Sequence, residues 1–215
     1  MKGYVFIANS TKPSAEKRKS RELYKLSNVV KPCAQAALDK GYDVFVGVNR
    51  DNPETLECDM PVKLFDQNTY RSLTDFKENR KAYKNMCKLL SENDVEVIHC
   101  NTPIGGMIGR ICGKKYKVKK VIYTAHGFHF YKGAPLFNRT VIKWVERFMA
   151  RWTDAVITMN KEDFEEAKKF KLRNNGKAYF VHGVGINTKD FNIECDKKAK
   201  LQELGLKETD KFHIS

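Results

Sequence analysis

The sequence predicts an α/β protein built on a Rossmann-like parallel sheet with helices on both faces. Short apolar, β-branched runs alternate along the chain with longer segments of helical periodicity. Such alternation is typical of parallel strands that helices cover on both sides. Several runs also end abruptly in polar or glycine residues, at the edge of an open parallel sheet where ligands bind.

The first half of the chain is expected to open with a βαβ unit. Tyr4 to Ala8 is a short apolar strand, and Asn28 to Lys40 is a helix that ends at Gly41. Asp43 to Val48 is the next strand, and Pro61 to Phe65 is a candidate for another.

A long, heavily charged helix is expected from Tyr70 to Glu92. The candidates for its inner side are Phe76, Tyr83, Met86, Leu89 and Leu90. Val95 to Cys100 then forms a compact strand. Thr102 and Pro103 are typical of a helix start, with Thr as N-cap and Pro at the first helical position.

The alternation continues to about residue 181, with strands at Val118–Ala125, Ala155–Met159 and Lys177–Val181 and helices at Asn138–Trp152 and Lys161–Phe170. The first of these helices is amphipathic. Its apolar side, which we expect to be mostly core, comprises Val141, Ile142, Val145, Phe148, Met149 and Trp152. Its polar side comprises Lys143, Glu146, Arg147 and Arg151.

Composition excludes a disordered chain and favours anionic partners. The 215 residues are 41% hydrophobic and 31% charged, and 40 Lys and Arg against 26 Asp and Glu leave a net charge of +14. Such a field attracts nucleic acid, phosphorylated substrates or acidic lipid. The six cysteines form no Cys-x-x-Cys pair, and neither a signal peptide nor an apolar run of spanning length is present. We therefore expect a cytoplasmic protein with free thiols.

The stretch from Val121 to Pro135 carries the clearest chemical signal. A buried strand ends at His126 and Gly127, so the imidazole can donate to a hydroxyl or stabilise charge while glycine lets a ligand approach the backbone. The alternative is a histidine that caps the strand. If the ring faces an open cleft, His126→Ala leaves no buried partner unpaired and costs at most roughly half a kcal/mol.

Four more positions could contact a ligand. In the same loop, His129 and Lys132 could meet an acceptor, with Lys132 reaching a phosphate, or they could simply be solvated. Asn101 and Thr102 end another central strand, where they could bind an anionic or hydroxyl-rich ligand or form only a turn and N-cap. His99 is expected to be a packed histidine.

Other chemistry finds little support. Gly105, Gly106 and Gly109 lack the GxGxxG spacing of a dinucleotide site, so close helix–sheet packing is the preferred explanation for them. The first strand also leads into a loop without that fingerprint, which argues against a dehydrogenase. The five histidines show no metal-ligand spacing, and no metal is expected.

The order and spacing of several motifs resemble the amino-terminal half of bacterial family-4 retaining glycosyltransferases of the GT-B type. The motifs are VEVIHCNTP at 95–103, VIYTAHGFHFYKGAP at 121–135, TDAVITMN at 153–160 and VHGVGIN at 181–187. The first loop, 9–27, lacks the glycine pair that many members have there. In relatives the histidine that matches His126 lines the cleft beside the transferred sugar.

The resemblance implies one half of a GT-B fold, with residues 1–187 as the acceptor-side domain and 188–215 as a linker and the start of a donor-binding domain. A charged helix from Asp196 to Leu204 and a strand beginning at Phe212 are expected there. The chain stops before that domain, so catalysis by residues 1–215 alone is not expected. A nucleotide sugar would be a co-substrate, no further cofactor is implied, and acceptors would be glycans or polyprenyl-diphosphate-linked sugars of cell-surface polysaccharide synthesis.

The positive charge alone leaves two kinds of anionic partner open, a membrane surface and nucleic acid. Trp144, with Phe137, Phe130 and neighbouring basic residues, could form a belt at the inner face of the cell membrane. The basic loop Lys12 to Arg21 is a second candidate, although a solvated loop is the simpler interpretation. The alternative function is a basic Rossmann-like module that binds nucleic acid or another anion without catalysis, but no RRM, KH or helix-turn-helix signature supports it, so nucleic acid is not an expected partner.

Overall fold

The computed structural model describes residues 1–8, 10–72, 74–185, 188 and 196–207. The chain divides into two compact units, Met1–Val184 and Gly185–Ser215. The second unit contains the helix α7 (Lys197–Glu203), whose N-cap Asp196 accepts from the backbone of Lys198 and Ala199. The strand expected at Phe212 lies outside the described residues.

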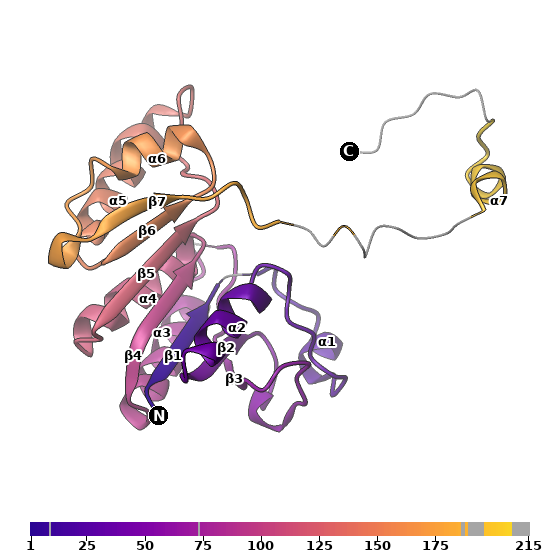
Figure 1. The fold of residues 1–215 in the computed structure, drawn as a ribbon, viewed down its shortest axis with the longest axis horizontal. Coiled ribbons are helices and arrows are strands. Elements are labelled where there is room, and N and C mark those ends of the chain that lie inside the picture. Colours follow the sequence, from indigo (N-terminus) through magenta and orange to yellow (C-terminus); the bar gives the residue numbers. More distant parts are fainter. Residues whose placement is uncertain (9, 73, 186–187, 189–195, 208–215) are drawn as a thin grey trace. The chain divides into compact units, whose positions relative to one another are not determined.

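The first unit is built on a seven-stranded sheet in the order β3-β2-β1-β4-β5-β6-β7, and every neighbouring pair is parallel (Figure 1). This confirms the predicted fold class. All seven strands lie within one or two residues of the predicted runs. Their bounds are β1 Gly3–Ile7, β2 Asp43–Val48, β3 Lys63–Asp66, β4 Val95–Asn101, β5 Lys120–Ala125, β6 Ala155–Thr158 and β7 Lys177–Phe180.

Helices cover both faces of the sheet, but unequally. One hydrophobic cluster packs α2 (Lys31–Asp39) against β1 and β2. A larger cluster joins the other face to α3 (Phe76–Glu92), α4 (Pro103–Lys115), α5 (Lys143–Ala150) and α6 (Lys161–Ala167). Short segments α1 (Ala15–Lys19), η1 (Pro53–Thr55), η2 (Asn138–Ile142) and η3 (Arg173–Asn175) complete the unit.

Helix α3 begins six residues later than predicted. Asp75 is its N-cap and accepts from the backbone N–H of Glu78 at 3.2 Å, while Tyr70 forms an isolated bridge with Ser10. Phe76, at the first helical position, is 80% exposed and does not belong to the inner side. The aspartate satisfies a helix-start donor that Tyr70 could not, so residues 71, 72, 74 and 75 lie outside the helix.

The basic segment Lys12 to Arg21 is held against the rest of the fold by hydrogen bonds and is not only a solvated loop. It contains α1, and the Arg18 side chain donates to Asp51 (2.8 Å), Asp66 (3.1 Å) and the Tyr70 hydroxyl (2.6 Å). Arg18 therefore fastens this segment to the β2–β3 edge of the sheet.

Close packing of α4 on the sheet explains its glycines, as predicted. A Cβ atom on Gly106 would lie 2.5 Å from the Tyr123 ring, and one on Gly109 would lie 2.6 Å from Cβ of Cys100. A Cβ on Gly105 would meet the backbone of Ala8 at 3.0 Å. Any side chain here would push the helix off the strands, so glycine sets the position of the α4 N-terminus.

A buried ion pair joins α4 to α5. The guanidinium of Arg110 donates twice to the Glu146 carboxylate, at 2.7 and 3.2 Å, donates to the Gly106 carbonyl at 2.9 Å and lies 4.1 Å from the centre of the Tyr123 ring. The prediction that Glu146 lies on the polar side of its helix is therefore wrong. Removing either partner would leave a buried charge uncompensated, at a cost of about 3–5 kcal/mol.

Other residues of the predicted amphipathic helix also face different directions from those expected. Residues 138–142 form a π-helical segment before α5, and one extra residue in a turn rotates the faces that follow. Met149 is buried as expected, but Val141 and Phe148 are exposed and do not belong to the core. Trp144 stacks on Phe148 with ring centres 5.5 Å apart.

Candidate functional site

The paired ends of β4 and β5 bring two predicted site residues together. Asn101 lies opposite Thr124 in the parallel register, and His126 follows two residues later on the same side of the chain. Nε2 of His126 lies 3.1 Å from Oδ1 of Asn101. Because an amide oxygen only accepts, Nε2 carries the proton and Nδ1 of the neutral ring is an acceptor.

The Asn101 amide is buried next to the His126 ring. Only 2% of the residue is exposed, and its Nδ2 has no hydrogen-bond partner among the described residues. A buried donor without a partner costs about 1–3 kcal/mol. Unsatisfied polar groups of this kind need an explanation, and a ligand is one.

Partial burial controls the charge of His126. Desolvation lowers its pKa below the ordinary value, so the ring is neutral at neutral pH. Deeper in the sheet, His99 is bonded to the Tyr4 hydroxyl (2.6 Å) and to Thr124 (2.8 Å), and burial lowers its pKa to about 4. His99 is therefore the packed histidine that the sequence predicted.

A cavity of about 690 Å³ opens beside His126 at the carboxyl end of the sheet. It brings together four of the predicted site residues, Thr102, His126, Gly127 and His129. A Cβ atom on Gly127 would meet nothing within 4 Å, so a ligand has room against this backbone. The remaining lining residues are Arg71, Pro103, Ile104, Tyr123, Phe128 and Tyr131.

Thr102 has an unusual backbone conformation in this wall, with φ 62° and ψ 164°. A β-branched residue is strained there by about 1–3 kcal/mol, and such strain clusters at ligand sites. Its side chain does not cap α4 as predicted, because the hydroxyl donates to the carbonyl of Asn101. The helix start therefore faces the cavity without a side-chain cap from Thr102.

Helix α6 holds the loop that carries the other site residues. The backbone N–H of Phe128 donates to Asp163 (3.0 Å), and that of Lys132 donates to Glu162 (2.6 Å). Both acids lie in the first turn of α6. Lys132 is exposed but is not among the residues that line the cavity.

Arg71 is the lining residue that sequence reasoning missed. It lies in the segment before α3 that we expected to be helical, and nothing in the surrounding sequence marks it. Only the fold, which brings the loop after β3 to the same sheet edge as His126, places its charge at the cavity.

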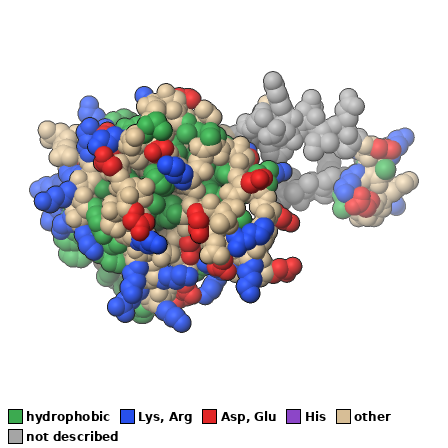
Figure 2. All heavy atoms as spheres, turned by 90° about the horizontal axis from the view of Figure 1, so that it is seen from below, with side chains coloured by type: hydrophobic (Ala, Val, Ile, Leu, Met, Phe, Trp, Pro, Cys, Tyr) green, Lys and Arg blue, Asp and Glu red, His purple; other side chains and the backbone are tan. Residues whose placement is uncertain are grey.

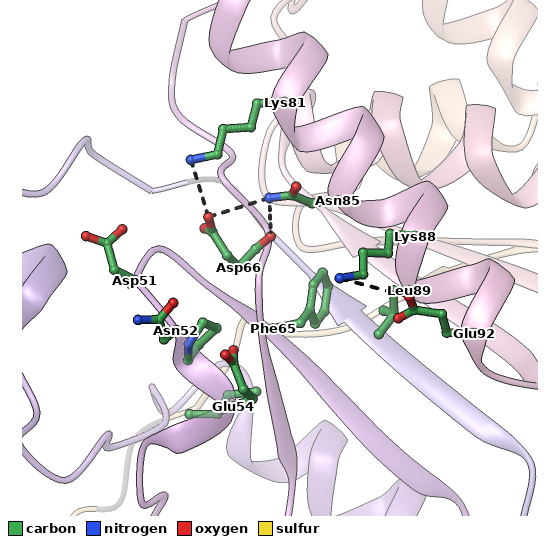
Figure 3. Close-up of a pocket in the computed structure, with 12 residues that line it drawn as sticks. Asp51, Asn52, Glu54, Phe65, Asp66, Lys81, Asn85, Lys88, Leu89 and Glu92 are labelled. Carbon is green, nitrogen blue, oxygen red and sulfur yellow. Dashed lines mark hydrogen bonds and ion pairs between the residues drawn. The ribbon is translucent and has the colours of Figure 1, made fainter.

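A second hollow of about 640 Å³ lies between η1, β3 and α3 and shares no lining residue with the first (Figure 3). Its charges largely pair within its own wall. Lys81 lies 3.7 Å from Asp66, Lys88 lies 3.9 Å from Glu92, and Asn85 donates to the Asp66 carbonyl at 2.8 Å. The His126 cavity is therefore the better candidate site. In the described part of the chain, no group of three or more His, Cys, Asp or Glu side chains could hold a metal ion.

The family match and the fold identify a glycosyltransferase domain with the Rossmann-like architecture of GT-B proteins. Residues 24–160 match the profile of the family described as "Glycosyl transferase 4-like", and the chain belongs to this family. The structure is similar to sucrose-phosphate synthase from Thermosynechococcus elongatus, with a TM-score of 0.62, 16% identity and coverage of 94% of this chain and 53% of that one. It is also similar to HepE from Anabaena, solved with UDP and glucose, with a TM-score of 0.56, 14% identity and coverage of 95% and 50%.

Two of the curated proteins that are similar in sequence come from Bacillus subtilis and Escherichia coli. EpsD of Bacillus subtilis, named as a glycosyltransferase, is 36% identical over 137 residues, which is 62% of this chain and 36% of EpsD. An Escherichia coli UDP-Gal:alpha-D-GlcNAc-diphosphoundecaprenol alpha-1,3-galactosyltransferase is 27% identical over 167 residues, which is 77% of this chain and 43% of that enzyme. The chain thus spans about two fifths of the length of these relatives.

The bond to Asn101 corrects the expected effect of removing His126. The substitution His126→Ala leaves the buried Asn101 oxygen unpaired, so we expect it to destabilise the domain by about 1–2 kcal/mol, not by half a kcal/mol. Urea unfolding measures this, with His129→Ala as the control, since that exposed residue should cost less than about 0.5 kcal/mol. Equal small losses in both variants would show that the His126–Asn101 bond does not contribute to stability.

Proposed function

We propose that this chain is the acceptor-side half of a retaining glycosyltransferase. It would help to transfer a sugar from a nucleotide-sugar donor to a hydroxyl of a glycan or of a polyprenyl-diphosphate-linked sugar in cell-surface polysaccharide synthesis. The observation that carries the proposal is the His126–Asn101 pair at the mouth of a cavity large enough for sugar residues. Family membership and the diphosphoundecaprenol acceptor named for the Escherichia coli relative support it.

In this proposal His126 is the group that touches the reacting sugar. Asn101 holds the ring through Nε2, so Nδ1 can accept a hydrogen bond from a sugar hydroxyl and orient it. The ring can also take up a proton and stabilise negative charge as it develops. Gly127 leaves the space that lets the sugar approach, and His129 lines the same cavity.

The donor would be held by a second domain, so one wall of the cleft should not suffice for catalysis. We expect the 215-residue chain to give no turnover with a panel of nucleotide sugars and lipid-linked acceptors. Supplying the part of EpsD that this chain does not match, fused after Val184, should produce transfer. His126→Ala should then lower kcat about 100-fold with little change in acceptor binding. Turnover by the chain alone, or an unchanged kcat in the variant, would contradict the proposed division of roles.

We further propose that the domain acts at the inner face of the cell membrane. An apolar face formed by Leu136, Phe137, Val141, Trp144 and Phe148 projects from η2 and α5 into solvent. Phe130, which we expected in this belt, is instead buried and stacked on Phe128, with ring centres 4.7 Å apart. The apolar face therefore lies entirely on residues 136–148.

Basic residues flank this apolar face. Arg151 lies 5.8 Å from the centre of the Phe148 ring, and Arg139 and Arg147 are exposed on the same segment. Lys and Arg are also numerous on the side of the molecule that Figure 2 shows, with Asp and Glu between them. Among the described residues no helix is both long enough and apolar enough to cross a bilayer. Aromatic and basic residues on one short helix support contact with an anionic lipid surface instead.

The membrane proposal predicts selective, salt-sensitive binding to vesicles. The chain should sediment with vesicles rich in anionic lipid more than with neutral ones, and added salt should weaken the binding. Trp144→Ser should reduce it roughly tenfold, because a side chain that is 65% exposed in solution would lose its insertion into lipid. Phe76→Ser removes an even more exposed aromatic ring outside the apolar face and serves as the control. Equal partitioning to both vesicle types, or equal effects of the two substitutions, would contradict the proposal.

A further inference from the structure

The His126 cavity has an uncompensated positive charge. Arg71 is the only Lys or Arg among its lining residues, and the lining includes no Asp or Glu from the described part of the chain. Arg71 is exposed, and its guanidinium forms no ion pair or hydrogen bond with any described residue. The fork of five donors is therefore available to a ligand with oxyanion groups.

The start of α4 adds to this positive field. Pro103 and Ile104 line the cavity, and the first bond of the helix runs from the Gly106 N–H to the Thr102 carbonyl at 2.7 Å. The amides of Ile104 and Gly105 precede that bond and have no acceptor within the helix. A helix of 13 residues also directs its dipole at whatever occupies the cavity.

A buried donor beside the cavity is an independent sign of a ligand. Nδ2 of Asn101 has no partner among the described residues, and the oxygen of the same amide already binds His126, whose ring lines the cavity. An arginine without a partner and a helix start therefore line the same cavity. The unpaired amide of Asn101 is not in the lining and is connected to the cavity through His126. All three complement oxyanions.

We propose that Arg71 binds a diphosphate group in this cavity, together with the first turn of α4. This inference deepens the proposed function, on which it rests, and assigns to Arg71 the phosphate contact that the sequence suggested for Lys132. A diphosphate carries more oxyanion groups than a carboxylate or a single phosphate, so it can engage the guanidinium and the helix start together. The apolar side chains of Ile104, Phe128 and Tyr131 line the same cavity and suit the group that the diphosphate joins.

Either substrate of such a transferase could supply the diphosphate. A lipid-linked acceptor carries one between isoprenoid and sugar, and a nucleotide sugar carries one between nucleoside and sugar. The cavity lies in the half of the fold assigned to the acceptor, so we expect the acceptor's diphosphate here.

Titration calorimetry on the 215-residue chain tests the proposal with three probes: inorganic diphosphate, geranyl diphosphate and UDP. Arg71→Gln should raise the Kd for inorganic diphosphate about tenfold or more, and Arg71→Lys should restore part of the affinity. Arg80→Gln is the matched control, because this exposed arginine of α3 does not line the cavity and forms no ion pair with a described residue. Its Kd should change less than twofold. Thermal melting should be the same for all variants.

The two organic probes separate the sources. Tighter binding of geranyl diphosphate than of UDP, lost in Arg71→Gln, supports the acceptor's diphosphate, and the reverse order assigns the site to the donor's. Equal losses in Arg71→Gln and Arg80→Gln, or no diphosphate binding by the wild type, would overturn the proposal. Because no transfer is measured, a failure here is distinct from a failure of the glycosyltransferase assay.

Discussion

The site depends on the parallel register between β4 and β5. Because Asn101 pairs with Thr124, the chain brings His126 to within 3.1 Å of the buried Asn101 amide one step beyond the sheet. A shift of one residue would turn Asn101 to the opposite face and leave the imidazole without its partner. The same pair of strands holds the buried His99 against Thr124, so the polar groups below the site are also fixed by this register.

Helix α4 links the register to both proposed surfaces. Its glycines place the helix start directly on β4 and β5, which opens the cavity beside His126, and its Arg110 fixes α5 through Glu146. That ion pair uses the buried side of α5 and leaves Trp144 and Phe148 outward. One helix therefore sets the positions of the His126 cavity and of the apolar face together. In the proposed function, an acceptor held at the membrane would meet the cavity from a fixed direction.

The sequence predicted the sheet well because buried parallel strands are nearly continuous apolar runs, and polar residues directly after such a run identify the ligand edge. Asn101, Thr102, His126, Gly127 and His129 were predicted in this way, and all but Asn101 line the cavity. Lys132 was assigned to the phosphate contact only by its nearness in sequence, and it does not line the cavity. The site assignments themselves stay predictions until a ligand is bound.

What the sequence did not predict depends on contacts between distant segments. Arg71 reaches the cavity because the chain crosses from β3 at one edge of the sheet to β4 on the far side of β1. The residues around Arg71 do not indicate that crossover. Glu146 was expected in solvent because it lies among charged residues on one side of the predicted helix. Helix periodicity cannot show that a buried arginine of α4 will contact it. The exposed Val141 and Phe148 follow from a π-helical turn, which no local pattern marked.

The most direct test is the protonation of His126 in the intact chain, read by nitrogen-15 imidazole NMR across pH. The neutral ring, held by Asn101 and partly desolvated, should carry its proton on Nε2 at pH 7 and titrate below about 6.5, the ordinary value for histidine. Asn101→Ala should abolish the preference for that tautomer, and a bound acceptor sugar should shift the Nδ1 resonance. A His126 that is charged at pH 7, or protonated on Nδ1 in the wild type, would contradict the account of how this site is held.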